Sequence, residues 1–176
     1  MEELDVVLLS DTGEPIGSQS KALVHTTDTA LHLAFSCHLF NDQGQVLVTR
    51  RAMSKITWPG VWTNSFCGHP QPGEDPLDAI RRHAEVELGC KIEDLQIQLP
   101  DFRYRAVDAS GIVENEICPV YTARLVGELQ PNPAEVVDWQ WVNPQDLAQS
   151  VDATPWAFSP WLVEQRPQLR IYHAGL

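Results

Sequence analysis

The chain has 176 residues, of which 43% are hydrophobic, so it can bury one core, and we expect a single domain over residues 1–176. Its formal net charge is −12 and its pI is near 4.7. Binding to nucleic acid or to an anionic membrane needs clustered Lys and Arg, so this charge balance argues against both kinds of surface. An anionic ligand would therefore require a local basic pocket.

The first residues carry no sign of a targeting segment. The start, MEELDVVLLS, lacks a basic region, and its apolar run over 6–9 is too short for a signal peptide or a membrane span. We therefore expect a cytoplasmic protein. Four widely spaced cysteines form no C-x-x-C pair, which argues against a zinc ribbon or a thioredoxin-type site. In a reducing compartment they should be free thiols; they are Cys37, Cys67, Cys90 and Cys118.

Strand-like and helix-like segments alternate along the chain and predict an α/β (α+β) fold with a mixed β-sheet. Strands are expected at about 5–10, 33–40, 45–50, 101–107, 115–126 and 136–142. Residues 41–44 form a polar turn that ends in Gly44, so the strands on either side of it should form a hairpin.

The clearest predicted helix covers residues 76–88. Asp75 is a suitable N-cap, Pro76 suits the first helical position, and Gly89 is placed to end the helix. Its apolar stripe leaves the opposite face available for polar chemistry; the stripe consists of Leu77, Ile80, Ala84 and Leu88. Shorter helices are expected from residues 143–144 onwards and over about 156–166.

The segment GHPQPGEDPLDAIRRHAEVELG resembles the Nudix box, G-x5-E-x7-R-E-U-x-E-E-x-G-U. The matching positions are Gly68, Glu74, Arg82, Glu87 and Gly89. In that box a loop and a helix hold a divalent cation against a diphosphate, and oxygen ligands suit Mg²⁺ and Mn²⁺. His83 and Val86 stand where hydrolases of the family carry glutamates. We therefore expect diphosphate binding without hydrolysis.

Further motifs lie on both sides of the box. They are HTTDTALHLAF (25–35), TRRAMSK (49–55), WPGVWTNSFCGHP (58–70), FRYRA (102–106), GIVENEICPV (111–120) and ATPWAFSPW (153–161). Together they resemble type 1 isopentenyl-diphosphate isomerases, a Nudix-fold family of isoprenoid biosynthesis, over nearly the whole chain. The resemblance implies a mixed sheet sandwiched by helices, and an enzyme that interconverts isopentenyl diphosphate and dimethylallyl diphosphate.

The resemblance also implies that Cys67 and Glu116 act on opposite faces of the alkene, with Tyr104 assisting Glu116. Moving an unactivated double bond requires adding a proton at one carbon and removing one from another, so one group must donate and the other accept. A lone cysteine is more often a small buried hydrophobe, but Cys67 immediately precedes the Gly68 start of the box. The sequence leaves open which of the two groups protonates the alkene.

Two metal positions are implied by the resemblance. The first combines three imidazoles and two carboxylates: His25, His32, His69, Glu114 and Glu116. Glu114 and Glu116 are two residues apart, so in an extended segment they share a face. Mn²⁺, Mg²⁺ and Zn²⁺ all remain possible there. At the second position, Mg²⁺ would bridge the substrate diphosphate to Glu87.

Three basic residues and one tryptophan complete the implied site. Lys21, Arg51 and Lys55 match the diphosphate contacts of the family, and Trp161 would stabilise a positive carbon through its ring. His83 replaces an arginine that other members often carry, which would make one phosphate contact weaker or dependent on pH. The expected partner is a small-molecule diphosphate, with no nucleic acid or membrane, and the protein is expected to be a monomer.

Three alternatives remain. A Nudix hydrolase would require the box glutamates that His83 and Val86 replace. A binding module that has kept the fold without activity would not need both Cys67 and Glu116. A flavin-dependent isomerase would need another fold and a flavin site, of which the sequence shows no sign. The isomerase is the interpretation that accounts for the cysteine, the two glutamates and the histidines together.

Overall fold

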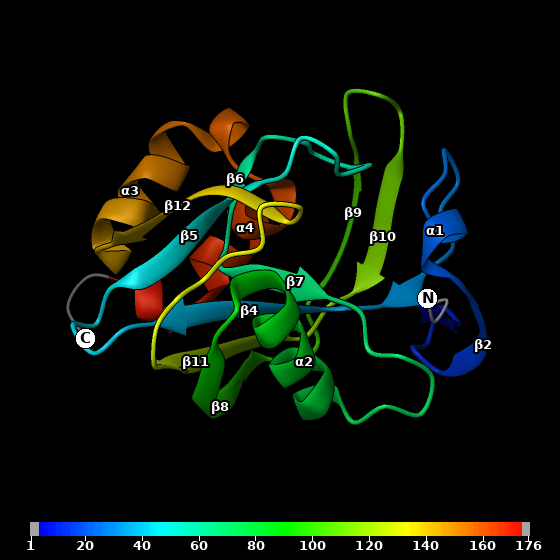
Figure 1. Cartoon of the computed structure of the whole chain (residues 1–176). Helices are drawn as coiled ribbons and strands as arrows, with labels where there is room; N and C mark the ends of the chain where they lie inside the picture. Colours follow the sequence, from blue (N-terminus) through cyan, green and yellow to red (C-terminus); the bar gives the residue numbers. More distant parts are fainter. Residues whose placement is uncertain (1–3, 174–176) are drawn as a thin grey trace.

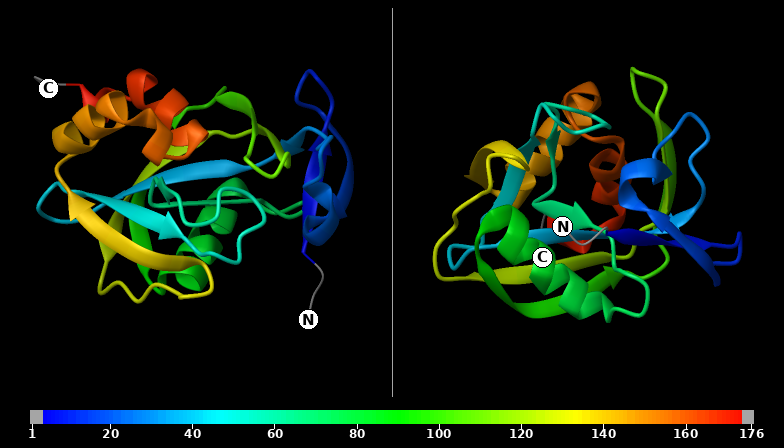
Figure 2. Two further views of the ribbon diagram at one scale, coloured as in Figure 1. Left: turned by 90° about the horizontal axis from the view of Figure 1, so that it is seen from above. Right: turned by 45° about the vertical axis from the view of Figure 1, so that its right-hand side comes forward.

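The computed structural model describes residues 4–173 and contains two mixed β-sheets with helices around them (Figure 1). The outer sheet has the strand order β2-β1-β3-β10-β9. Its strands are β1 (Asp5–Leu9), β2 (Pro15–Ser20), β3 (His32–Leu33), β9 (Arg103–Val107) and β10 (Val113–Ile117). Figure 2 shows β1 and β2, in blue, at one end of the molecule.

The central sheet has the order β12-β5-β4-β11-β8, with β6 and β7 paired to β5 and β4. Its strands are β4 (Phe35–Phe40), β5 (Val46–Arg51), β6 (Trp62–Thr63), β7 (Phe66–Gly68), β8 (Lys91–Leu99), β11 (Val120–Val126) and β12 (Val136–Val142). The hairpin predicted at residues 41–44 is present, because Phe40 pairs with Val46 and Gly44 has φ +73°.

Helices cover both faces of the central sheet (Figure 1). They are α2 (Pro76–Leu88), α3 (Pro144–Ala153) and α4 (Pro160–Gln165), with short 3₁₀ turns at Pro155–Ala157, Arg166–Gln168 and Arg170–Tyr172. The one-turn helix α1 (Lys21–Val24) lies instead against β1 and β2 of the outer sheet. Phe35, Cys37 and Leu39 of β4 pack in the core on the α2 side. Side chains alternate along a strand, so the residues between them face α4 and the C-terminal turns. The predicted fold class is confirmed.

The chain crosses between the two sheets at two neighbouring places. Strands β3 and β10 pair in parallel in the outer sheet, and the strands that follow them, β4 and β11, pair in parallel in the central sheet. Ala34 separates β3 from β4, and Cys118 and Pro119 separate β10 from β11. Proline lacks an N–H group for a sheet ladder, which favours a break at this point. The crossing brings residues of both sheets around one pocket.

Most predicted elements are confirmed, with some corrections. The helix over 76–88 begins and ends as expected: Asp75 accepts a hydrogen bond from the Leu77 N–H, and Gly89 is left-handed with φ +59°. The strands predicted over 33–40 and 115–126 are each divided between two strands, because the chain passes from the outer sheet to the central sheet at Ala34 and at Pro119. The helix predicted over 156–166 is a 3₁₀ turn followed by α4, because Ser159 caps a new helix that starts at Pro160.

The sequence prediction missed the strands β2, β6, β7 and β8 and the one-turn helix α1. Strand β8 is mostly polar and exposed and contains Asp94 at φ +52°, which hides its alternation. Within residues 4–173 no helix is both long and apolar enough to cross a membrane.

Candidate active site

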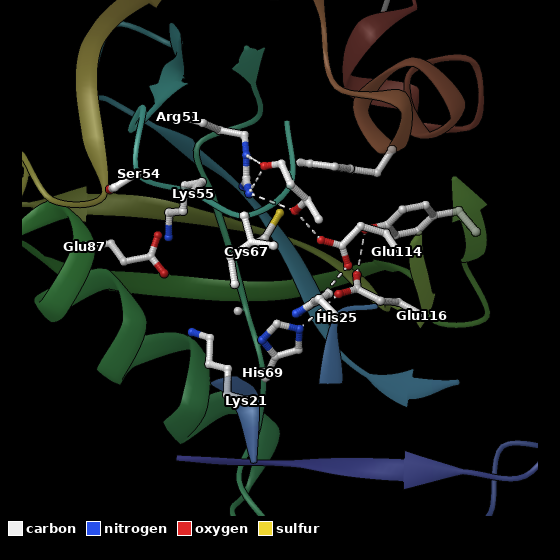
Figure 3. Close-up of a pocket in the computed structure, with 15 residues that line it drawn as sticks. Lys21, His25, Arg51, Ser54, Lys55, Cys67, His69, Glu87, Glu114 and Glu116 are labelled. Carbon is white, nitrogen blue, oxygen red and sulfur yellow. Dashed lines mark hydrogen bonds and ion pairs between the residues drawn. The ribbon is translucent and has the colours of Figure 1, made fainter. Parts of the chain in front are cut away.

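A pocket of about 200 Å³ lies where the two sheets meet (Figure 3). All the predicted site residues line it except His32, which is fully buried behind it. The lining residues are Lys21, His25, Arg51, Ser54, Lys55, Ile56, Thr57, Cys67, Gly68, His69, Glu87, Tyr104, Glu114, Glu116 and Trp161. They come from α1, β5, β7, α2, β9, β10 and α4 and from the segments between them.

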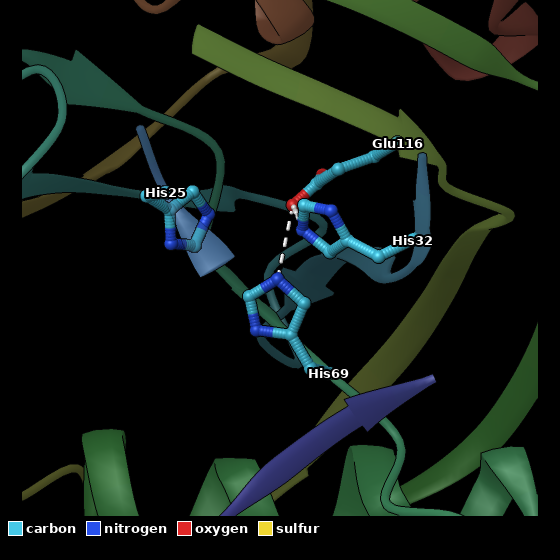
Figure 4. Close-up of side chains that lie close together, drawn as sticks. All are labelled: His25, His32, His69 and Glu116. Atoms are coloured by element: carbon cyan, nitrogen blue, oxygen red, sulfur yellow. Dashed lines mark hydrogen bonds and ion pairs between the residues drawn. The ribbon is translucent and has the colours of Figure 1, made fainter. Parts of the chain in front are cut away.

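Three histidines and one glutamate lie together at the outer-sheet side of the pocket (Figure 4). One ligand atom from each of His25, His32, His69 and Glu116 lies within 4.8 Å of the others. We call these four residues the open cluster. The strand register places Glu116 opposite His32 on one side and Tyr104 on the other. Its Oε1 lies 3.0 Å from His69 Nε2 and 3.4 Å from His32 Nε2.

The nitrogen atoms of the open cluster fit a metal ion. His32 Nδ1 lies 2.9 Å from the Ala30 carbonyl and must donate to it, which leaves Nε2 with a lone pair. That Nε2 atom is buried and has no hydrogen-bond partner among residues 4–173, and the same holds for His69 Nδ1. Buried polar atoms are normally paired, so the unpaired His32 Nε2 beside the Glu116 carboxylate, with His69 Nε2 at the same oxygen, indicates a divalent-metal site.

Glu114 lies next to the open cluster but outside the group of four. Its Oε2 is 3.0 Å from His25 Nε2, and its Oε1 accepts a hydrogen bond of 2.6 Å from the Thr57 hydroxyl. Both Glu114 and Glu116 are buried and line the pocket, as their shared strand face predicted. Glu114 therefore orients His25 and can approach a metal ion held by the cluster.

The open cluster favours an ionised Glu116. Burial alone would raise the pKa of Glu116, but the adjacent imidazoles of His32 and His69 favour the charged carboxylate and hold its pKa well below the usual value. Burial lowers the pKa of His69 to about 3, so its imidazole is neutral, as a metal ligand must be. The Tyr104 hydroxyl is buried and donates a 2.8 Å hydrogen bond to Glu116 Oε2. This bond fixes the orientation of the Glu116 carboxylate within the pocket.

Cys67 lies in β7 between the open cluster and the basic side chains (Figure 3). Its sulfur is half-buried and lies 3.2 Å from Ser36 Oγ and 3.3 Å from Asn64 Oδ1. Burial raises the pKa of the Cys67 thiol to about 12. The other three cysteines are also free thiols, but each is buried away from this pocket's lining. The free state predicted for all four is therefore confirmed.

The basic side of the pocket contains Lys21, Arg51 and Lys55. Arg51 donates to the carbonyls of Thr57 and Trp58, and its Nη1 makes no hydrogen bond within residues 4–173. Its guanidinium carbon lies 5.2 Å from the centroid of the Trp161 ring. Burial lowers the pKa of Lys21. Lys55 forms an ion pair with Glu135, a residue that the sequence did not indicate.

The Nudix-box helix contributes Glu87. Its carboxylate lies near Lys55, on the side of the pocket away from the histidines (Figure 3). His83 does not line the pocket, contrary to the phosphate contact considered for it. Instead it is buried, and its Nδ1 lies 2.8 Å from Glu87 Oε1. A side chain at Gly68 would meet the His83 ring at 2.5 Å, so that close approach requires glycine. Val86 is 56% exposed and does not line the pocket.

Sequence reasoning missed three supporting residues besides Glu135. Thr57 orients Glu114, and Asn64 contacts both Cys67 and Trp161. Ser36 lies beside Cys67 from another strand. Asn64 stands in the NSFCGH motif that drew attention to Cys67. Thr57 and Ser36 offered no signal, because their roles depend on contacts across 57 and 31 residues of sequence.

Comparisons with known proteins show which family the chain resembles. Residues 30–162 match the NUDIX domain family. The chain is 62% identical over 170 residues to an isopentenyl-diphosphate Delta-isomerase of Clavibacter michiganensis subsp. michiganensis, covering 97% of this chain and 88% of that relative. It is 56% identical over 176 residues to an isopentenyl-diphosphate Delta-isomerase of Citrobacter koseri, covering 97% of each chain.

Solved structures support the fold alone. A crystal structure of a Deinococcus radiodurans protein has a TM-score of 0.72 at 21% identity and covers 94% of this chain and 99% of that one. A MutT protein of Methanosarcina mazei has a TM-score of 0.59 at 16% identity and covers 76% of this chain and 88% of that one. With curated relatives this similar over nearly its whole length, the chain belongs to the NUDIX-domain family of isopentenyl-diphosphate Delta-isomerases.

Proposed function

We propose how this member of the family interconverts isopentenyl diphosphate and dimethylallyl diphosphate: the alkene lies between Cys67 and Glu116, which exchange protons with its opposite faces. The observation that supports this most directly is a thiol from β7 and a carboxylate from β10 lining one pocket. One group gives a proton to one carbon, the other removes a proton from another carbon, and the double bond shifts. No proton is gained or lost overall.

Tyr104 and Trp161 shape the reacting end of the pocket. Tyr104 holds Glu116 through the 2.8 Å hydrogen bond, so the carboxylate stays aimed at the alkene. Trp161 is 3% exposed and its Nε1 donates to Asn64 Oδ1 at 2.9 Å, which fixes the indole. A fixed aromatic face stabilises a cation-like carbon by about 1–2 kcal/mol. These buried rings also exclude water, which would otherwise trap such a carbon.

The diphosphate end lies against Lys21, Arg51 and Lys55. Arg51 suits this task because its remaining nitrogen can grip a phosphate oxygen while the Thr57 and Trp58 carbonyls hold the rest of the guanidinium. Lys55 must exchange Glu135 for the phosphate. The contact of Arg51 with Trp161 joins the phosphate end of the pocket to the alkene end.

Two divalent ions fit the proposed site. The open cluster with Glu114 would hold Mn²⁺, Mg²⁺ or Zn²⁺, and Glu87 would hold Mg²⁺ against the diphosphate. When bound, these ions supply positive charge that orients the carboxylates and offsets the charge of the diphosphate. We further propose that the protein works as a cytoplasmic monomer. Its net charge of −12 favours solubility and opposes self-association, and its four cysteines are free thiols, as a reducing compartment would keep them.

Proton NMR in D₂O with isopentenyl diphosphate and Mg²⁺ tests this function. Deuterated dimethylallyl diphosphate should appear, and treatment with a chelator should stop its formation. Release of inorganic phosphate or pyrophosphate would instead indicate a hydrolase. A spectrum that stays unchanged with folded, metal-loaded protein would leave only a binding module.

Cys67→Ala tests the catalytic assignment. Turnover should be abolished while diphosphate affinity stays largely intact, because a group that acts in the transition state adds little to ground-state binding. Cys90→Ala is the matched control, since Cys90 is a buried free thiol packed beneath α2. Full activity of Cys67→Ala would show that the sulfur is not a catalytic group.

A further inference from the structure

Ser36 faces Cys67 directly across two strands. Strand β4 pairs with β7 in antiparallel register, with Ser36 opposite Cys67. Residues directly opposite each other in an antiparallel pair point to the same face and lie close together. Ser36 is fully buried, and its Oγ is 3.2 Å from the Cys67 sulfur. The Ser36 hydroxyl is therefore fixed against the sulfur by the sheet itself.

The neighbours of Ser36 determine where its proton points. Gln165 Nε2 donates to Ser36 Oγ at 2.9 Å and fills one of its lone pairs. The Cys118 thiol, 3.4 Å away, can fill the other. A hydroxyl has two acceptor positions and one donor hydrogen. When the Cys118 thiol donates to Ser36, the hydroxyl hydrogen is left to point at the Cys67 sulfur, and in this arrangement Ser36 is the donor to that atom.

His38 and Tyr172 fix the orientation of the Gln165 amide. Gln165 Oε1 can only accept, so the His38 Nε2 atom, 3.0 Å away, carries the hydrogen. His38 Nδ1 then accepts from the Tyr172 hydroxyl at 2.6 Å. All three side chains are buried, with at most 2% exposed. With this tautomer of His38, the Gln165 NH₂ group faces Ser36 and donates to it.

The proton of the Cys67 thiol is held loosely by comparison. It points to Asn64 Oδ1 at 3.3 Å, but the same oxygen also accepts from Trp161 Nε1 and from the Thr63 hydroxyl, both at 2.9 Å. A carbonyl oxygen has two lone pairs, so three donors compete for it. The longest bond, from sulfur, is the weakest of the three. The sulfur can release its proton toward the pocket while the Ser36 bond stays in place.

We propose that Ser36, oriented by Gln165, is a positioning residue that holds the Cys67 sulfur at the alkene by donating a hydrogen bond to it. The proposal rests on the catalytic role proposed for Cys67. In either direction of the reaction the sulfur bears negative charge on one side of the proton transfer, and a hydrogen bond to a charged acceptor is stronger than one to a neutral acceptor. Ser36 therefore favours the charged state that the reaction needs.

Ser36→Ala, Ser36→Thr and Gln165→Glu test the proposal, with kcat, KM and bound metal measured for each. Ser36→Ala should lower kcat roughly 10- to 100-fold and leave KM and metal content within about twofold. Ser36→Thr keeps the hydroxyl and should recover most of that loss. Gln165→Glu keeps Ser36 but lacks the N–H group, so the serine proton turns to the carboxylate and kcat should again fall.

Ser65→Ala is the matched control. Ser65 is also a fully buried serine with two hydrogen bonds, but its partners are the backbone groups of Leu39 and Leu47. It should lower the melting temperature as much as Ser36→Ala does and leave kcat unchanged. If Ser36→Ala and Gln165→Glu match Ser65→Ala in kcat while Cys67→Ala is inactive, this inference alone is wrong. Activity in Cys67→Ala would instead overturn the proposed function.

Discussion

Two buried histidine clusters lie beside Cys67, and they differ in how their polar atoms are paired. The open cluster leaves His32 Nε2 and His69 Nδ1 without a hydrogen-bond partner among residues 4–173. The second, which we call the closed cluster, consists of Ser36, His38, Gln165 and Tyr172. There each side chain is hydrogen-bonded to the next, from the Tyr172 hydroxyl to the Ser36 hydroxyl.

The difference separates a ligand site from a structural support. An unpaired buried polar group costs about 1–3 kcal/mol, so the open cluster weakens the fold unless something binds it. The closed cluster has no such cost, and it ties β4 to α4 and to the C-terminal 3₁₀ turn. The presence of a histidine alone therefore does not distinguish a metal ligand from a structural residue. The hydrogen bonding of its two ring nitrogens does.

Removing one histidine ligand from the open cluster should have the largest effect on metal binding and turnover. We expect His32→Ala to lose the bound divalent ion and to lower turnover by more than about 100-fold, because loss of a ligand exceeds the loss caused by its supporting residues. Metal content after dialysis, measured by mass spectrometry, checks this. His38→Gln alters the closed cluster and should keep its metal. A His32→Ala protein that retains both metal and turnover would contradict the assignment of the open cluster.

Glu87→Gln should separate the two proposed metal positions. Glu87 faces Lys55 on the far side of the pocket from the histidines (Figure 3). We expect its loss to raise the KM for substrate roughly 10- to 100-fold, in a manner that excess Mg²⁺ partly corrects, while the open cluster keeps its ion. Titration of substrate at several Mg²⁺ concentrations, with metal analysis, measures both effects. If Glu87→Gln weakened substrate binding and removed the ion of the open cluster to the same extent, the two metal positions would be one.

The closed cluster should make the folding stability of the protein sensitive to acid. Burial lowers the pKa of His38 to about 4, whereas an unfolded histidine titrates near 6.5. As the pH falls through this window the unfolded chain binds a proton first, so stability is lost. Between pH 7 and pH 5 the wild type should lose about 2 kcal/mol more than His38→Gln does. Urea denaturation at the two pH values measures this, and parallel losses in both proteins would show that His38 is not the group responsible.

Local signals in the sequence predicted much of this structure. The helix at 76–88 has its own cap and terminator, so its ends could be predicted without knowledge of the rest of the fold. Of its predicted apolar stripe, Ile80, Ala84 and Leu88 are buried, but Leu77 in the first turn is exposed. The spacing of Glu114 and Glu116 likewise placed both in the pocket. Such features depend on a few consecutive residues, and sequence patterns record them directly.

Features that depend on distant contacts could not be predicted. Nothing near Ser36 indicates that it will lie opposite Cys67, because the β4–β7 register sets that pair. The position of His83 behind Gly68 also follows from helix packing, and its motif position alone suggested a phosphate contact.

The ion pair of Lys55 and Glu135, on the basic side of the pocket, gives the smallest expected effect. Lys55 is bound to Glu135, and both side chains are about one quarter exposed, at 26% and 27%. A partly exposed ion pair contributes about 0.2–1 kcal/mol, and substrate must break this one before Lys55 can reach the diphosphate. Glu135→Gln should therefore lower the KM by about two- to fivefold with kcat unchanged. Glu93→Gln, which removes an exposed partner of Arg124, is the control and should change neither. A higher KM in Glu135→Gln would mean that Glu135 orients Lys55 toward the phosphate and does not compete with it.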